Sequence, residues 1–280
     1  MLKIIFDLTD FEEVEIVPIA DTHIGNPLSD IQALHDLISY VNQEPEDPKC
    51  GRICLLNGDL TESVTRKSVG DPFSMTMTPS VQVATMIQML KPLAEPREHY
   101  PMGKILSYCS GNHDEGRYKD TGISAAKSIA VGLALDDRYS PDGCYSFVKL
   151  KRINDKSKSP IATVNIYNTH MTGGGSTVGG KANRASKLGI NGGIIADLCI
   201  GSHVHQPISF KEDILVPNNN VTSLVQKTVT YLVTNAFLRY GDYAQRAGMK
   251  PATIEVPKVH IKQDRYSNNR SRFIKVEVRL

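Results

Sequence analysis

The chain has 280 residues, of which 40% are hydrophobic and 22% are charged. This is enough apolar material for a large core and excludes a globally disordered chain. The 32 basic and 30 acidic residues give a net charge of +2, so the overall composition makes no case for binding nucleic acid or a membrane. With no linker evident, we expect a single domain over residues 1–280.

The sequence also indicates a cellular compartment. No stretch is long and apolar enough to span a bilayer, and the N-terminal segment has acidic residues where a signal peptide would have its cleavage site. The five cysteines are odd in number and lie mostly in apolar contexts. Reduced, buried thiols are therefore expected in place of a disulfide framework. We expect a cytoplasmic protein without membrane contact, and the sequence leaves the oligomeric state open.

The first half alternates strand and helix signals. Short apolar runs predict strands at 15–20, 53–57 and 104–109. Apolar residues at helical spacing predict helices at 29–43, 78–95 and 121–133. Ser29 is placed to cap the first helix. In the second helix the spacing puts four residues on one face: Val83, Ile87, Leu90 and Ala94.

The second half is rich in strands. Segments 145–151 and 161–168 are typical of a hairpin around a polar turn, and a short helical stretch is expected near 184–188. An apolar run follows at 194–200, and strands are expected at 208–213, 221–237 and 272–280. Helices in the first half and strands in the second favour an α/β domain of stacked sheets with helices outside.

Residue types that bind metal ions recur where strands are predicted to end. The five motifs are Asp21-Thr22-His23, Gly58-Asp59, Gly111-Asn112-His113-Asp114, Thr169-His170 and Ser202-His203-Val204-His205. Ligand sites of open α/β sheets form beyond the carboxyl ends of strands, so five loops could converge on one site. The oxygen and nitrogen ligands suit Mn, Fe or Zn. A lone histidine is more often structural, but five of the eight histidines fall within these motifs.

The ordered series DxH, GD, GNHD, a lone histidine and HxH resembles the calcineurin-like metallophosphoesterase superfamily. The motifs extend from Asp21 to His205, about two thirds of the chain. The resemblance implies a β-sandwich flanked by helices in four layers (α/β/β/α), with a dinuclear centre of divalent metal ions at one edge. Manganese is the metal we expect, with iron, zinc or magnesium as alternatives.

The resemblance also implies individual ligands. Three side chains would hold one metal ion: Asp21, His23 and His205. Three others would hold the second: Asn112, His170 and His203. Asp59 would bridge the two. The chain departs from the family pattern at Ser202, where glycine is usual, and at Thr169, which precedes His170 in the place of a glycine.

A bound metal ion lowers the pKa of its water from about 15.7 toward about 7, so hydroxide becomes available to attack phosphorus in line. His113 matches the non-ligand histidine that the family has beside the scissile phosphate. It would stabilise the transition state or protonate the leaving oxygen. Asp114 would either orient His113 through its second ring nitrogen or cap the following turn.

The glycine-rich segment 173–187 follows His170 closely. Gly175 to Lys181 fits the start of a phosphate-binding loop, but Ala182 stands where a magnesium-binding hydroxyl is needed, which excludes an ATPase. One interpretation is a loop that binds a phosphate-rich substrate through Lys181, Arg184 and Lys187. The other is a surface loop with solvated charges.

Other segments could also contact a substrate. The long connection 60–79 offers Arg66, Lys67 and Phe73, although its methionines could instead pack at a subunit interface. Basic residues gather at 149–158 and 250–280, either to follow a nucleic-acid backbone or as solvated strand faces.

Leu60 after Gly-Asp is more similar to the phosphodiesterase and nuclease branches of the superfamily than to its protein phosphatases. We therefore expect hydrolysis of phosphodiesters, with DNA, RNA or a nucleotide as substrate. The alternatives are a phosphomonoesterase and, in a different class, a scaffold that keeps the fold without catalysis. The presence of every ligand position and of His113 argues against the scaffold.

Overall fold

A computed structural model describes residues 1–66, 71–153, 160–173, 177–218, 221–241, 245, 251, 254–264 and 274–280. Its strands are β1 (Leu2–Leu8), β2 (Glu13–Ile19), β3 (Cys50–Asn57), β4 (Ile105–Cys109), β5 (Tyr139–Ser140), β6 (Cys144–Lys151), β7 (Ile161–Thr169), β8 (Leu198–Gly201), β9 (Ile208–Pro217), β10 (Leu224–Val233), β11 (Lys258–Gln263) and β12 (Ile274–Arg279). Its helices are α1 (Ile31–Asn42), α2 (Pro79–Ala94), α3 (Asn112–Thr121), α4 (Ala125–Gly132), α5 (Val178–Ser186) and the 3-10 turn η1 (Ile190–Gly192).

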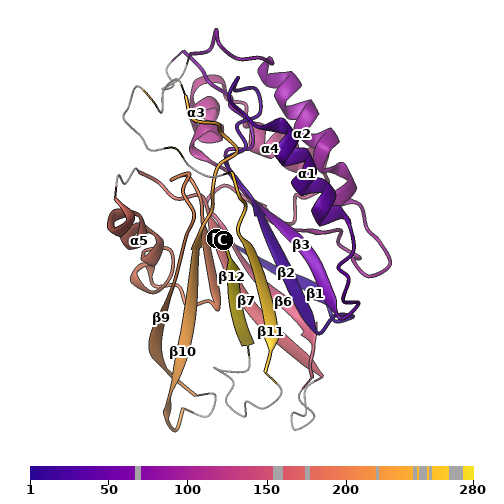
Figure 1. Ribbon diagram of the computed structural model, residues 1–280, viewed down its shortest axis with the longest axis vertical. Coiled ribbons are helices and arrows are strands. Elements are labelled where there is room, and N and C mark those ends of the chain that lie inside the picture. Colours follow the sequence, from indigo (N-terminus) through magenta and orange to yellow (C-terminus); the bar gives the residue numbers. More distant parts are fainter. Residues whose placement is uncertain are drawn as a thin grey trace.

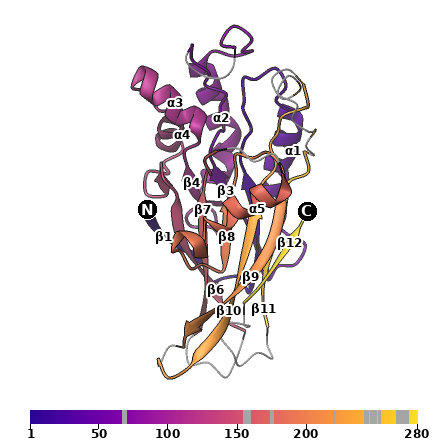
Figure 2. The same cartoon turned by 90° about the vertical axis from the view of Figure 1, so that its left-hand side faces the viewer.

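The strands form two six-stranded sheets, with the orders β1-β6-β7-β8-β10-β9 and β12-β11-β2-β3-β4-β5. Strands β2 to β5 run parallel, as do β7, β8 and β10, and β1 runs parallel to β6. The antiparallel pairs are β6–β7, β9–β10, β2–β11 and β11–β12. Figure 2 shows β1 and the N-terminus on the left and β12 and the C-terminus on the right. The parallel strands place several carboxyl ends at the same edge, which is the geometry that a shared site needs.

Three apolar clusters define four layers. The first fills the space between the sheets, where Phe6 and Ile166 of one sheet share a cluster with Ile16 and Leu55 of the other. The second lies between the β2–β4 face and helices α1, α2 and α4, and the third lies between β8, β10 and α5. In Figure 1, α5 lies at the left beside β9 and β10, and α1 and α2 lie at the upper right. The predicted α/β/β/α sandwich is therefore confirmed.

The predicted elements match the observed ones in most places, with shifted ends. The predicted hairpin is the antiparallel pair β6 and β7, and its turn at 154–159 lies outside the described residues. Strands β1 and β11 were not expected, because neither stands out from its neighbours by composition. Each pairs at or near a sheet edge, where burial of one face suffices.

Three predictions about helices were wrong in detail. Asp30, not Ser29, caps α1, since its side chain accepts from the Ala33 N–H while the Ser29 hydroxyl donates to Thr22 O. The buried face of α2 is Gln82, Met86, Leu90 and Leu93. The helix predicted at 121–133 is α4, which begins only after its cap Ser124, and the separate helix α3 precedes it.

Among the helices that the structure describes, none combines the length and apolarity needed to cross a bilayer. All five cysteines are free and buried. Burial raises the pKa of the Cys54 and Cys144 thiols to about 12, so they are protonated at neutral pH and carry no reactive thiolate.

Candidate metal centre

The loops that carry the five motifs meet at one edge of the sandwich. Asp21 and His23 follow β2, Asp59 follows β3, and Asn112 and His113 open α3 after β4. His170 follows β7, and His203 and His205 follow β8. Asn57, the last residue of β3, joins the two sheets at this edge. Its Nδ2 donates to Thr169 O and to Ser202 Oγ, each at 3.0 Å.

The first group of possible ligands is Asp21, His23 and His205, whose ligand atoms lie within 4.8 Å of one another. His23 Nδ1 lies 2.9 Å from Glu62 Oε2, which leaves Nε2 on the other side of the ring. Within the part of the chain that the structure describes, His23 Nε2 is buried without a hydrogen-bond partner, and Asp21 Oδ1 has His205 Nε2 beside it at 3.3 Å. An unpaired buried group costs about 1–3 kcal/mol, so a cation fits this position beside His23 Nε2.

The second group is Asp59, His170 and His203, again within 4.8 Å of one another. His170 Nε2 lies 3.2 Å from Asp59 Oδ2 and 3.0 Å from Asn112 Oδ1, so the amide of Asn112 faces the same point. His170 Nδ1 lies 2.9 Å from Asn57 O, a carbonyl that can only accept. Nδ1 therefore carries a proton, and Nε2 is the nitrogen available to a metal ion.

Ser202, the departure from the family pattern, takes part in this arrangement. It is fully buried, and its hydroxyl lies 2.8 Å from His170 Nδ1 and donates to Asn57 O. The serine therefore fits the loop and adds contacts that hold the His170 ring, which a glycine could not supply.

The two groups adjoin each other. The backbone N–H of His203, in the second group, donates to Asp21 Oδ2 of the first at 3.0 Å. Asp21, His23, Asp59, His203 and His205 all have positive φ angles. Such angles are uncommon for residues other than glycine and cost free energy, and strain of this kind concentrates at functional sites.

The charges at the second group suit a cation. Burial opposes ionisation of Asp59, but His170, together with His113 and His23, outweighs burial and holds the pKa of that carboxyl well below its ordinary value. Burial likewise opposes protonation of His170, yet Asp59 raises the pKa of His170 to about 10. Burial and the neighbouring His170 lower the pKa of His203 to about 4, which keeps the ring neutral. A metal ion would have to displace one proton from His170, and binding would release it.

His113 stands beside the first group. Its ring centroid lies 4.6 Å from that of His23, and its Nδ1 lies 2.7 Å from Glu62 O. Because a carbonyl accepts, Nδ1 donates and Nε2 points away from Glu62. The Asp114 carboxylate accepts from the Gly111 N–H at 3.0 Å. Of the two roles expected for Asp114, the structure therefore shows the cap, and the orienting role was wrong because Glu62 occupies that side of His113.

Sequence reasoning missed Glu62. It is buried, its carboxylate fixes His23 and its carbonyl fixes His113, and the side chains of all three form a further group within 4.8 Å. The only signal was a carboxylate three residues after Asp59. A carboxylate that holds the second nitrogen of a ligand histidine sets its tautomer and raises its basicity.

Replacing Glu62 by alanine is therefore expected to weaken metal binding about 10–100-fold. Glu62→Gln keeps an acceptor for His23 Nδ1 and should lose less metal affinity than Glu62→Ala. The backbone carbonyl that holds His113 remains in both variants. Chelator competition measures the affinity, and wild-type affinity in Glu62→Ala would contradict this role.

Gly111 makes room for Asp59. A Cβ at Gly111 would lie 2.0 Å from Asp59 Oδ1 and 2.3 Å from Asp59 N. Gly111→Ala is therefore expected to displace Asp59 and lower both metal content and melting temperature. Gly116→Ala, in the same helix α3, is the matched control because a Cβ there meets nothing within 4 Å. It should retain metal and gain about 0.5–1 kcal/mol of stability. Full metal content in Gly111→Ala would contradict the packing argument.

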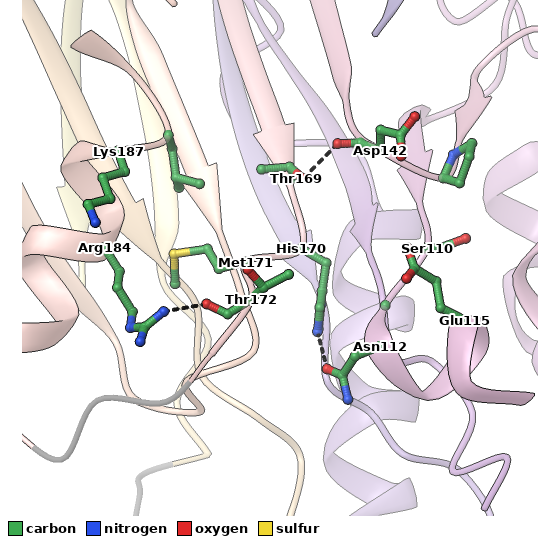
Figure 3. A pocket seen from close by; sticks show the side chains of 13 residues that line it. Ser110, Asn112, Glu115, Asp142, Thr169, His170, Met171, Thr172, Arg184 and Lys187 are labelled. Atoms are coloured by element: carbon green, nitrogen blue, oxygen red, sulfur yellow. Dashed lines mark hydrogen bonds between the residues drawn. The ribbon is translucent and has the colours of Figure 1, made fainter. Parts of the chain in front are cut away.

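Of the predicted substrate residues, the structure brings two to the centre. Arg184 and Lys187 line a pocket of about 480 Å³ together with His170 and Asn112. Figure 3 shows both on the opposite side of Met171 from His170. Lys181 does not line this pocket, because it is buried and its Nζ donates to Gln206 Oε1. A contact between Lys181 and a substrate stays a prediction.

The remaining candidates lie elsewhere. Phe73 is 86% exposed and Arg66 is also exposed, and neither lines the pocket. Met77 packs partly buried against the α2 cluster. Lys67, residues 174–176 and much of the two basic segments, including Tyr266 and Phe273, lie outside the described residues.

No family model matches the sequence, and no curated protein matches it. Among solved structures, the crystal structure of a metallophosphoesterase from Sphaerobacter thermophilus is similar over 95% of this chain and 88% of that chain, with 12% identity and a TM-score of 0.35. No role of an individual residue is taken from this similarity. The four-layer fold and the convergence of the five motifs agree with what the resemblance of the sequence to the calcineurin-like metallophosphoesterase superfamily implies.

Proposed function

We propose that the protein is a metal-dependent hydrolase of phosphodiesters. The observation that carries the proposal is the pair of adjoining ligand groups, one of which holds His23 Nε2 buried without a hydrogen-bond partner among the described residues. Asp21, His23 and His205 would hold one metal ion, and Asn112, His170 and His203 the other. Asp59 would contact both. Manganese suits this set of carboxylate, amide and imidazole ligands, as do iron, zinc and magnesium.

Two such ions would polarise the phosphate oxygens and supply a nucleophile from water at neutral pH. The side chains of the protein do the rest. Glu62 and Asn57 hold the second nitrogens of His23 and His170, so each ring presents Nε2 in a fixed orientation. This preorganisation removes the cost of orienting the ligands during the reaction.

His113 would give a proton to the leaving oxygen. Burial disfavours its charged form, but Asp59 and Glu62 together outweigh burial and raise the pKa of His113. The ring is therefore ready to donate from Nε2, because Nδ1 is engaged with Glu62 O. General acid catalysis of this kind is worth about 10²–10⁴-fold in rate.

Phosphodiesters are favoured over monoesters by the open pocket beside Asn112, which offers space for a second ester arm. Nucleic acid or a nucleotide is the substrate class that this proposal favours. The free, buried cysteines are consistent with a reducing, cytoplasmic location. A phosphomonoesterase is the second candidate function.

A comparison of the cleavage rates of a phosphodiester and a phosphomonoester tests the reaction class. The protein is stripped with a chelator, restored with manganese, and assayed on bis-p-nitrophenyl phosphate and p-nitrophenyl phosphate. Faster cleavage of the diester, dependent on manganese, is the expected result. Faster cleavage of the monoester would favour the phosphatase, and no metal-dependent cleavage of either would contradict the proposal.

A further inference from the structure

The pocket beside the candidate metal centre is lined by residues of only one of the two ligand groups. Its lining includes Asn112 and His170 of the second ligand group, whereas His23, His205 and His113 are not part of it. At about 480 Å³ it is large enough for a ligand of nucleotide size. Whatever enters it therefore reaches the centre from the side of Asn112 and His170.

One wall of the pocket is cationic. Arg184 Nη1 donates to Thr172 O at 2.6 Å, which fixes the guanidinium and leaves its other N–H groups for a ligand. A Cβ at Gly173 would lie 2.5 Å from the same nitrogen, so the glycine lets Arg184 approach the backbone. Lys187 is exposed on the same wall. Among the described residues, neither cation is paired with a carboxylate.

The other walls have a different chemistry. Glu115 and Asp142 lie across the pocket from α5, and Met171 and Leu188 supply apolar surface (Figure 3). An anion is therefore attracted to the α5 wall and repelled from the opposite one, where hydroxyl or N–H donors would fit. The pocket suits a ligand with a phosphate at one end and polar groups along its length.

Which ester arm enters the pocket follows from the position of His113. As the proton donor, His113 faces the leaving oxygen, so the arm that leaves lies on the His23 side of the centre. The arm that stays on phosphorus then points toward Asn112 and His170, where the pocket opens. This step rests on the proposed function.

We propose that the pocket binds the retained arm of a phosphodiester that carries a second phosphate, held by Arg184 and Lys187. The substrate class is then a chain with successive phosphates separated by a short polar spacer, as in a nucleic-acid strand. Charge-assisted hydrogen bonds from a guanidinium and an ammonium are the strong contacts for such a group. Lys181 takes no part, since it contacts Gln206.

Two chromogenic substrates that differ only in the second phosphate test this proposal. They are thymidine 5′-(p-nitrophenyl phosphate) with and without a 3′-phosphate, assayed with manganese-restored enzyme. Two charge-assisted contacts in a solvent-accessible pocket predict that the 3′-phosphate raises kcat/KM by about tenfold or more. In the variant Arg184→Gln/Lys187→Gln this ratio should fall toward one. Lys91→Gln, an exposed cation on α2, should keep the wild-type ratio.

Binding supplies a readout independent of turnover. Calorimetry with manganese-loaded protein compares thymidine 3′,5′-bisphosphate with thymidine 5′-monophosphate, and the bisphosphate should bind about tenfold more tightly, again only with Arg184 and Lys187 present. Equal affinities would overturn the pocket assignment even if diesters are cleaved. A preference for the bisphosphate without any diester cleavage would support the pocket and contradict the proposed function, so the two failures are distinguishable.

Discussion

Replacing Asp59 by asparagine is expected to remove both metal ions with little effect on the fold. Asp59 is 1% exposed, and its Oδ2 lies 3.2 Å from His170 Nε2. Asparagine tolerates the φ angle of 50° and keeps an oxygen for the N–H of His113, but it lacks the charge that a bridging ligand supplies. Loss of a supporting residue near a metal already costs 10–100-fold in affinity, so a loss of at least about a hundredfold is expected here.

Metal content after dialysis and kcat/KM on bis-p-nitrophenyl phosphate measure this effect. Asp36→Asn, an exposed carboxylate of α1, is the matched control and should retain both metal and activity. A melting temperature close to wild type would show that the fold survives. Two equivalents of bound metal in Asp59→Asn would contradict the bridging role.

Replacing His113 by alanine is expected to leave metal binding unchanged and to lower kcat by about 10²–10⁴-fold. His113 Nδ1 is engaged with Glu62 O, so the ring is not free to ligate through that nitrogen, and Nε2 remains for the leaving oxygen. The loss of kcat should be larger for a dinucleotide than for bis-p-nitrophenyl phosphate, because an alkoxide leaving group needs protonation more than a nitrophenolate leaving group does.

His35→Ala is the control for this variant, because His35 is exposed on α1. Metal content and kcat are measured on the same preparations. If His113→Ala loses metal in proportion to activity, His113 is a ligand and the proton-donor role is contradicted. Equal losses on the two substrates would show that His113 acts on the phosphate and not on the leaving group.

The convergence of the motif residues could be predicted because it depends on local features. Each motif residue follows an apolar run that reads as a strand, and parallel strands bring their carboxyl ends to one edge. The contacts that orient these ligands could not be predicted in this way. Glu62 meets His23 across 39 residues, and Asn57 meets His170 across 113. Such contacts depend on how the loops and the two sheets meet, which no short pattern records.

The errors in the helices have a similar origin. Gln82, a polar residue, is buried on α2 because its amide donates to Met77 O and accepts from the Ser63 N–H. An apolar periodicity cannot anticipate a buried glutamine that joins two loops. Helix α3 was missed because its polar sequence NHDEGRYKDT has no apolar periodicity, and its first turn is held by the Asp114 carboxylate, which accepts from the Gly111 N–H.

The most direct test of a dinuclear centre is a crystal structure of the protein with manganese, with the ions located by anomalous scattering. Two peaks about 3.5–4 Å apart are the expected result. One should be bound by Asp21, His23 and His205, the other by Asn112, His170 and His203, with Asp59 in contact with both. A single peak, or peaks that Asp59 does not touch, would contradict it.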